Sequence, residues 1–132
     1  PDIAGIAAKA LKEARYHIRH TSQWVIRLGD GTEESHARVQ DSLNELWRFT
    51  GEMFQGDEVD ERLQVEGIAP DPATLHAPWK TVVDDVFARA GLTIPENVFM
   101  TRGGRTGKHT EHLGHMLAEM QIVARSHPGA EW

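Results

Sequence analysis

Cysteine is absent from this sequence of 132 residues, which excludes disulfide bonds, thiolate metal sites and cysteine nucleophiles. The sequence also lacks an apolar run near the ~20 residues that a membrane-spanning helix requires. Basic residues are in the minority, because fourteen Lys and Arg stand against twenty Asp and Glu, for a formal net charge of −6. We therefore expect no general attraction to nucleic acid or to a membrane surface. We expect a cytoplasmic protein, since the lack of cysteine suits a reducing compartment.

What the sequence does contain is typical of one folded domain. Hydrophobic residues make up 39% and charged residues 26% of the chain, a composition that argues against a disordered protein. The length fits a single domain or a piece of a larger one. Because residue 1 is Pro and not Met, we expect the chain to be a piece of a longer protein.

Helical periodicity governs nearly the whole chain. From about residue 3 to residue 28, apolar and small residues recur every three or four positions, the spacing of a bundle helix. We expect Gly29 to end this helix in a left-handed conformation, and Thr32 to begin a second helix that runs to Gly56. The short connection makes the two helices antiparallel neighbours. The residues of the first apolar seam are Ile3, Ala7, Ala10, Ala14, His17, Thr21, Trp24 and Leu28.

The second half of the chain is predicted to be helical with one long interruption. Asp71 and Pro72 have the pattern of an N-cap followed by proline at the first helical position, and Gly91 ends a strongly amphipathic segment. Tryptophans on helical seams are expected to lie in the core; they are Trp24, Trp47 and Trp79. The predicted segments are a short acidic helix at 57–67, helices at 79–90 and 108–126, and a long glycine-rich basic loop at 92–107.

Charge is segregated along the chain. Residues 1–29 hold five bases and two acids, whereas residues 30–66 hold eleven acids and three bases. The plainer interpretation of the acidic segment is a solvated helix exterior. The alternative is a docking surface for a basic partner.

Four Glu and His residues give a pattern close to that of a di-iron carboxylate site. Such sites take a Glu-x-x-His motif, spaced i and i+3, from each of two bundle helices, and oxygen and imidazole ligands suit iron. Here the spacing is i and i+4, which still places both side chains on one side of a helix. The i+3 positions hold Tyr16 and Gly114, and glycine has no side chain that can act as a ligand. The pairs are Glu13 with His17 and Glu111 with His115.

A true i, i+3 pair, Glu33 with His36, falls in the first turn of the second helix, away from the middle of the bundle. The other two pairs, Glu13 with His17 and Glu111 with His115, depart from the spacing of the motif. We interpret them as hydrogen-bonded or ion-paired groups of the core, as in a metal site that has lost its metal. No bound metal and no catalytic residue are expected in this chain. A di-iron carboxylate oxidase in its own right is the alternative.

The string RGGRTGKHT is the second candidate site. It is not a P-loop, because three residues separate Gly103 from Gly107 where a P-loop has four, and the final Ser or Thr is replaced. Arg102, Arg105 and Lys108 nevertheless lie just before a predicted helix N-terminus, a suitable position for one anionic group such as a phosphate of CoA. A helical module that binds CoA or another anion is thus a second alternative.

Three strings of the sequence are long and unusual: EARYHIRHTSQWVIRLGDGTEESH, ELWRFTGEMF and GGRTGKHTEHLGHMLAEMQ. They resemble the structural C subunits of bacterial 1,2-phenylacetyl-CoA epoxidases, which are ring-oxygenating multicomponent monooxygenases. The resemblance covers nearly the whole chain. It implies an all-α, ferritin-like four-helix-bundle fold, of which this chain is the C-terminal portion without the first bundle helices.

The function that the resemblance implies is that of a non-catalytic subunit in aerobic phenylacetate catabolism. In this family a homologous catalytic subunit keeps the di-iron ligands and binds the CoA thioester, and the structural subunit pairs with it and stabilises it. A further small subunit and an NADPH-dependent reductase with FAD and an iron–sulfur cluster complete the complex. We expect these subunits as partners and no cofactor in this chain. We also expect a homodimer, because a bundle without two of its helices exposes a large apolar seam.

Overall fold

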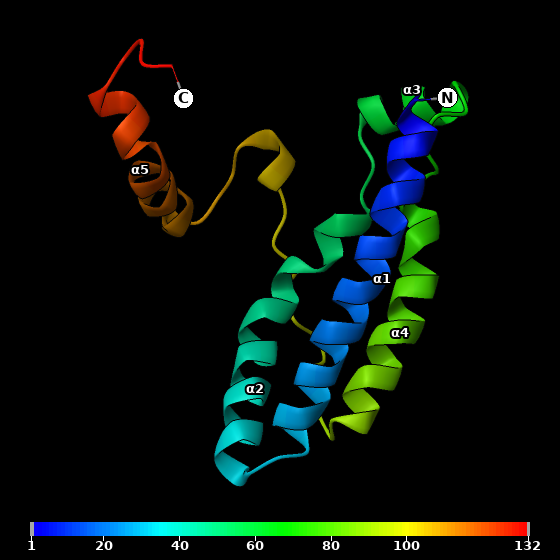
Figure 1. Cartoon of the computed structure of the whole chain (residues 1–132). Coiled ribbons are helices and arrows are strands. Elements are labelled where there is room, and N and C mark those ends of the chain that lie inside the picture. The colour runs from blue at the N-terminus through cyan, green and yellow to red at the C-terminus, as the bar shows by residue number, and fades with distance from the viewer. Residues whose placement is uncertain (1, 132) are drawn as a thin grey trace. The chain divides into compact units, whose positions relative to one another are not determined.

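The computed structural model describes residues 2–131, and all regular structure in that range is helical (Figure 1). The predicted all-α class is confirmed, and the helices are consistent with a ferritin-like bundle family. Within the same range, no helix has the length and apolar character needed to cross a membrane. The α-helices are α1 (Asp2–Gly29), α2 (Glu33–Leu46), α3 (Glu58–Val65), α4 (His76–Arg89) and α5 (Glu111–Ser126).

The chain divides into two compact units, one ending at Met100 and the other beginning at Thr101. The first unit contains α1 to α4. The second contains α5 and the loop before it. The two units are described separately below.

The corner between α1 and α2 is formed as the sequence predicts. Thr32 is the N-cap of α2, and its hydroxyl accepts a hydrogen bond from the Ser35 amide at 3.2 Å. The Ser35 hydroxyl in turn donates to the Leu28 carbonyl at 2.7 Å. Glu33 and Glu34 occupy the first turn of α2, where the helix dipole favours acidic groups. The two helices therefore run antiparallel from a short, hydrogen-bonded turn (Figure 1).

Gly29 differs from its prediction. It is the last residue of α1 and does not have a positive φ. It is buried, and a Cβ built on it would lie 2.5 Å from the Ala90 carbonyl oxygen. The glycine is required because the end of α4 passes directly over it, and not because the backbone turns left-handed there.

The second helix ends earlier than predicted. α2 stops at Leu46, and the chain continues as two 3₁₀ turns, Trp47–Phe49 and Gly51–Phe54. The Thr50 hydroxyl donates to the Trp47 carbonyl at 2.8 Å, which competes with the α-helical pattern. The tighter 3₁₀ turns bring Gly51 against the side chain of Met100.

The segment between α2 and α4 is organised by two N-caps. Asp57 accepts hydrogen bonds from the amides of Val59 and Asp60, while the Asp60 carboxylate accepts one from the Asp57 amide, a complete capping box for α3. Asp71 caps the 3₁₀ helix Pro72–Leu75, as its pattern predicts. α4 begins at His76, three residues before the predicted start, because Pro78 still lies in the first helical turn, where no intrahelical amide bond is lost.

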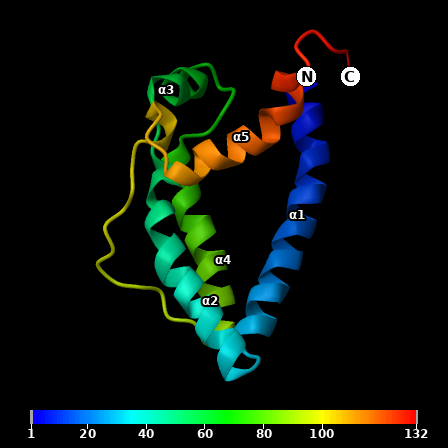
Figure 2. The same ribbon diagram turned by 90° about the vertical axis from the view of Figure 1, so that its left-hand side faces the viewer.

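The interior of the first unit lies where α1 and α2 meet the end of α4. Its most buried apolar residues are Val86, Ala90 and Leu92. α1 contributes its C-terminal part, whose less exposed residues are Ser22, Val25, Ile26 and Gly29. Toward its N-terminus α1 separates from α2 (Figure 2). The predicted seam of α1 is therefore not its packed side in this unit: Trp24 is 50% exposed and Ile3 is 71% exposed.

The second unit contains one helix and a glycine-rich approach to it. Gly103 and Gly107 both have positive φ, on either side of the 3₁₀ turn Gly104–Thr106. α5 begins at Glu111, three residues after the predicted start, because Gly107 is left-handed and Thr110 is extended. It ends at Ser126, as predicted.

Candidate functional site

Glu13 and His17 lie one turn apart on α1, and both side chains are exposed. No hydrogen bond or ion pair joins them, so the buried pair expected from the sequence does not form within residues 2–131. The His17 ring instead meets the edge of the Tyr16 ring, with centroids 6.0 Å apart. Tyr16 is at the position where a Glu-x-x-His motif has its histidine.

Glu111 and His115 lie one turn apart at the beginning of α5 and are also exposed. Gly114 occupies the i+3 position, and a Cβ built there meets no atom within 4 Å. This pair belongs to the second unit, whereas Glu13 and His17 belong to the first. Within residues 2–131, no three His, Asp or Glu side chains gather closely enough to hold a metal ion.

In the i, i+3 pair Glu33 and His36, at the corner between α1 and α2, the histidine forms a structural hydrogen bond. The Nδ1 atom of His36 lies 2.7 Å from the Gly29 carbonyl oxygen, so this nitrogen carries the hydrogen and donates it. That carbonyl is among the last four of α1, which have no partner in the helix itself. His36 thus helps close the C-terminal end of α1, and its position does not indicate a ligand.

The basic loop places its three candidate residues, Arg102, Arg105 and Lys108, in the second unit. The Lys108 side chain lies across Gly103, where a Cβ would come within 2.8 Å of its Cδ. The Lys108 amide donates to the Gly103 carbonyl at 2.9 Å. These contacts order the loop around Gly103 and do not by themselves form a site for an anion. The anion site stays a prediction from the sequence.

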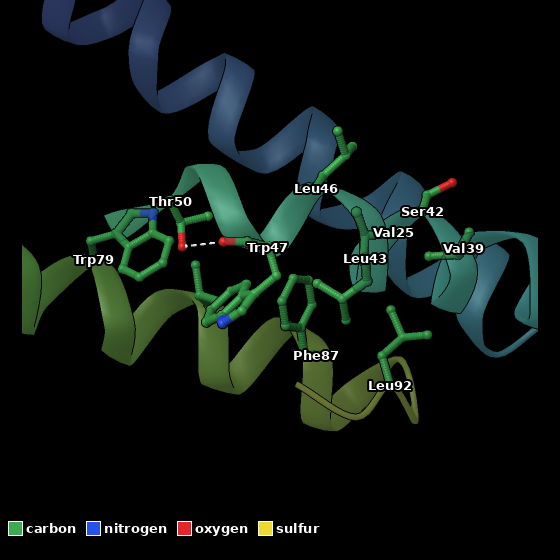
Figure 3. A pocket seen from close by; sticks show the side chains of 11 residues that line it. Val25, Val39, Ser42, Leu43, Leu46, Trp47, Thr50, Trp79, Phe87 and Leu92 are labelled. Atoms are coloured by element: carbon green, nitrogen blue, oxygen red, sulfur yellow. Dashed lines mark hydrogen bonds between the residues drawn. The ribbon is translucent and has the colours of Figure 1, made fainter. Parts of the chain in front are cut away.

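An apolar groove between α2 and α4 is the feature that sequence reasoning missed (Figure 3). Its cavity has a volume of about 280 Å³. Trp47 and Trp79 stack with centroids 5.8 Å apart, and Phe87 is 6.3 Å from Trp47. The helical seams predicted these residues to be core, and they do pack together, but each remains partly exposed. The lining residues are Val25, Val39, Ser42, Leu43, Leu46, Trp47, Thr50, Trp79, Val83, Phe87 and Leu92.

A second ring cluster adjoins this groove. The Phe54 ring lies 5.0 Å from Trp79 and 4.9 Å from His76, the latter edge to face. The groove and this cluster together join the 3₁₀ turns after α2 to the beginning of α4. Such an aromatic seam fits a packing surface between helices and offers few polar groups for chemistry.

The fold and these side chains define an all-helical protein whose candidate ligands lie on separate, exposed helix faces. A family model described as "Phenylacetic acid catabolic protein" matches residues 1–132, so the chain belongs to that family. The chain is also 50% identical over 132 residues to the C subunit of 1,2-phenylacetyl-CoA epoxidase from Escherichia coli (strain K12). All of this chain is matched, but only 53% of that relative, so the chain spans about half the length of the curated relative.

Proposed function

We propose that the chain acts as the corresponding part of a non-catalytic C-type subunit of a phenylacetyl-CoA epoxidase, in the aerobic breakdown of phenylacetate. The observation that carries this proposal is the 50% identity to the Escherichia coli relative, which extends over all 132 residues of the chain. In this role the chain supplies a helical surface that holds a di-iron catalytic subunit in its working assembly. The redox chemistry belongs to the other subunits.

The ligand pattern supports a non-catalytic role. The pairs Glu13 with His17 and Glu111 with His115 have i, i+4 spacing. The positions that a working motif gives to histidine hold Tyr16 and Gly114. Iron, FAD, the iron–sulfur cluster and NADPH are accordingly assigned to the partner subunits, and none to this chain.

The partners proposed are the homologous catalytic subunit, the further subunits of the complex, and a second copy of this chain. Exposed apolar side chains support both kinds of association, since monomers seldom leave extended apolar patches uncovered. Examples are Ile6 on α1, 70% exposed, and Val65 on α3, 88% exposed. The absence of cysteine supports a cytoplasmic location.

Co-elution with a catalytic subunit tests this function. The chain is co-expressed with the catalytic subunit of the Escherichia coli (strain K12) epoxidase and passed through a size-exclusion column with light scattering. We expect the two chains in one peak. The complete structural subunit of the same organism is the positive control. Separate peaks for this chain, alongside a single peak for the control, would contradict the proposal.

A further inference from the structure

The cations of α1 are unlike those of α2 and α4. Arg38 on α2 pairs with Glu34 at 3.6 Å, and on α4 Lys80 pairs with Asp84 at 2.6 Å and Arg89 with Asp85 at 3.4 Å. The five cations of α1 are all exposed, and none has an ion-pair partner within residues 2–131. They are Lys9, Lys12, Arg15, Arg19 and Arg27.

Two of these cations lie beside exposed aromatic rings. The Arg19 guanidinium lies 5.5 Å from the centre of the Tyr16 ring, and the Arg27 guanidinium lies 5.9 Å from that of Trp24. Lys12, Tyr16 and Arg19 are spaced by four and three residues, which places them along one side of α1. This side of α1 combines exposed apolar area with unpaired positive charge, the composition of an interface for an acidic surface.

Two acidic residues on the outer side of α2 lie between Arg38, which is paired with Glu34, and Arg48. Asp41 and Glu45 are exposed, have no ion-pair partner within residues 2–131, and are spaced i and i+4. Like charges at this spacing destabilise a helix by a few tenths of a kcal/mol, so a cation placed between them relieves a repulsion. The inward side of α2 carries Val39 and Leu43, which line the groove. Leu46 lines the same groove but is 61% exposed, so apolar area remains open at its edge.

We infer that α1 of one copy of this chain docks on the outer side of α2 of a second copy, with Lys12 and Arg19 against Asp41 and Glu45. This inference rests on the self-association proposed above and names its surfaces. Pairing of α1 with α1 of the other copy is disfavoured, because it sets unpaired cations against unpaired cations. Since every copy carries both surfaces, a two-fold dimer makes the contact twice.

The first test is the salt dependence of self-association. Sedimentation equilibrium of the unaltered protein is run at about 50 mM and about 500 mM NaCl, because salt screens charges that remain near water. We expect a dimer at low salt and a dissociation constant at least about tenfold weaker at high salt. A monomer at low salt would contradict both the proposed homodimer and this inference. It would indicate that the α1 surface binds a different acidic protein. A dimer that is indifferent to salt overturns this inference alone.

The second test is a charge exchange between two variants. The variant K12E/R19E makes both contacts repulsive, and so does D41K/E45K. Each is expected to be monomeric at low salt by itself. In an equimolar mixture, the altered α1 meets the altered α2 while the two natural surfaces meet each other, so the mixture is expected to dimerise. Two monomeric variants that stay monomeric when mixed would overturn the inference.

The variant R62E/R125E is the matched control. It makes the same change in net charge as K12E/R19E at residues that belong to neither α1 nor α2, and it is expected to dimerise like the unaltered protein. Far-UV circular dichroism of every variant verifies that the helices are retained. Loss of the dimer in this control would mean that net charge alone governs association, which would also overturn the inference.

Discussion

Gly29, at the end of α1, allows two helices to approach each other closely. A Cβ on Gly29 would lie 2.5 Å from the Ala90 carbonyl oxygen and 2.8 Å from the Ala90 Cβ. Both atoms belong to the buried end of α4, where Ala90 is 1% exposed. Because neither atom lies at the tip of a flexible side chain, a methyl group at residue 29 must push the helices apart.

We predict that Gly29→Ala lowers the free energy of unfolding by about 1–3 kcal/mol, the usual cost of overpacking. Gly5→Ala is the control, since it lies in the same helix and its Cβ meets nothing within 4 Å. It is expected to be neutral or to stabilise by up to about 1 kcal/mol. Urea unfolding followed by circular dichroism measures both variants. Equal effects of the two substitutions would contradict the close contact at Gly29.

Glycines also show what can be predicted at this scale from the sequence. Gly91 was predicted to end its helix, and its φ of 67° with the Leu92 amide bonded to the Phe87 carbonyl confirms a left-handed end. Gly29 also follows an apolar helical seam in the sequence, but it is the last residue within α1 and serves a close approach. The two uses leave the same pattern in the sequence, because the approaching residue, Ala90, is 61 positions away.

Among the elements, α2 is joined to the loop after α4 by hydrogen bonds of the Gln40 side chain. The Gln40 amide donates to the Thr93 carbonyl at 2.8 Å, and the Thr93 amide donates to the Gln40 Oε1 atom at 2.9 Å. This reciprocal pair imitates one rung of a β-ladder and holds the start of the loop beside α2. The buried Leu92 lies directly before it.

We predict that Gln40→Ala raises the hydrogen-exchange rate of the Thr93 amide about tenfold, since a hydrogen bond contributes about 0.5–1.5 kcal/mol. Gln40 also donates to the Asn44 Oδ1 atom at 2.9 Å. Asn44→Ala removes only that third bond and serves as the control, with little change expected at Thr93. Exchange measured by NMR distinguishes the two. An unchanged Thr93 rate in Gln40→Ala would contradict the reciprocal pair.

Tryptophan provides a second comparison between elements. Trp79 packs on Trp47 and Phe54, whereas Trp24 is 50% exposed on α1. We predict that Trp79→Ala lowers the free energy of unfolding by about 2–3 kcal/mol, somewhat less than for a fully buried ring. Trp24→Ala should cost under about 1 kcal/mol. Urea unfolding measures the free energy of unfolding of both variants. It is carried out in high salt, where the proposed dimer is expected to be weakened. A larger loss for Trp24 would contradict the packing described.

Helix positions were largely predictable from the sequence, but helix packing was not. The caps at Thr32, Asp57 and Asp71 are local signals, because each acts within three residues. The seam of α1 has apolar residues on more than one side, so periodicity alone does not say which side meets α2 and α4. The structure packs the side with Val25 and leaves the side with Trp24 exposed.

For the whole molecule, the distribution of charge and exposed apolar area is one basis of the association role that we propose. The candidate ligand pairs lie on exposed faces of two separate units. The unusual spacing of these pairs was evident from the sequence, but their exposure was not. Exposure depends on which helices surround a side chain, and the sequence pattern does not specify those neighbours.

The most direct test of the proposed role is the iron content of the complex with the catalytic subunit. The complex is prepared with the unaltered chain and with a variant in which Glu13, His17, Glu111 and His115 are all alanine, and iron is measured by plasma mass spectrometry. Iron per complex and epoxidation of phenylacetyl-CoA are predicted to be the same in the two preparations. A loss of iron and of epoxidation in the alanine variant would contradict the non-catalytic role.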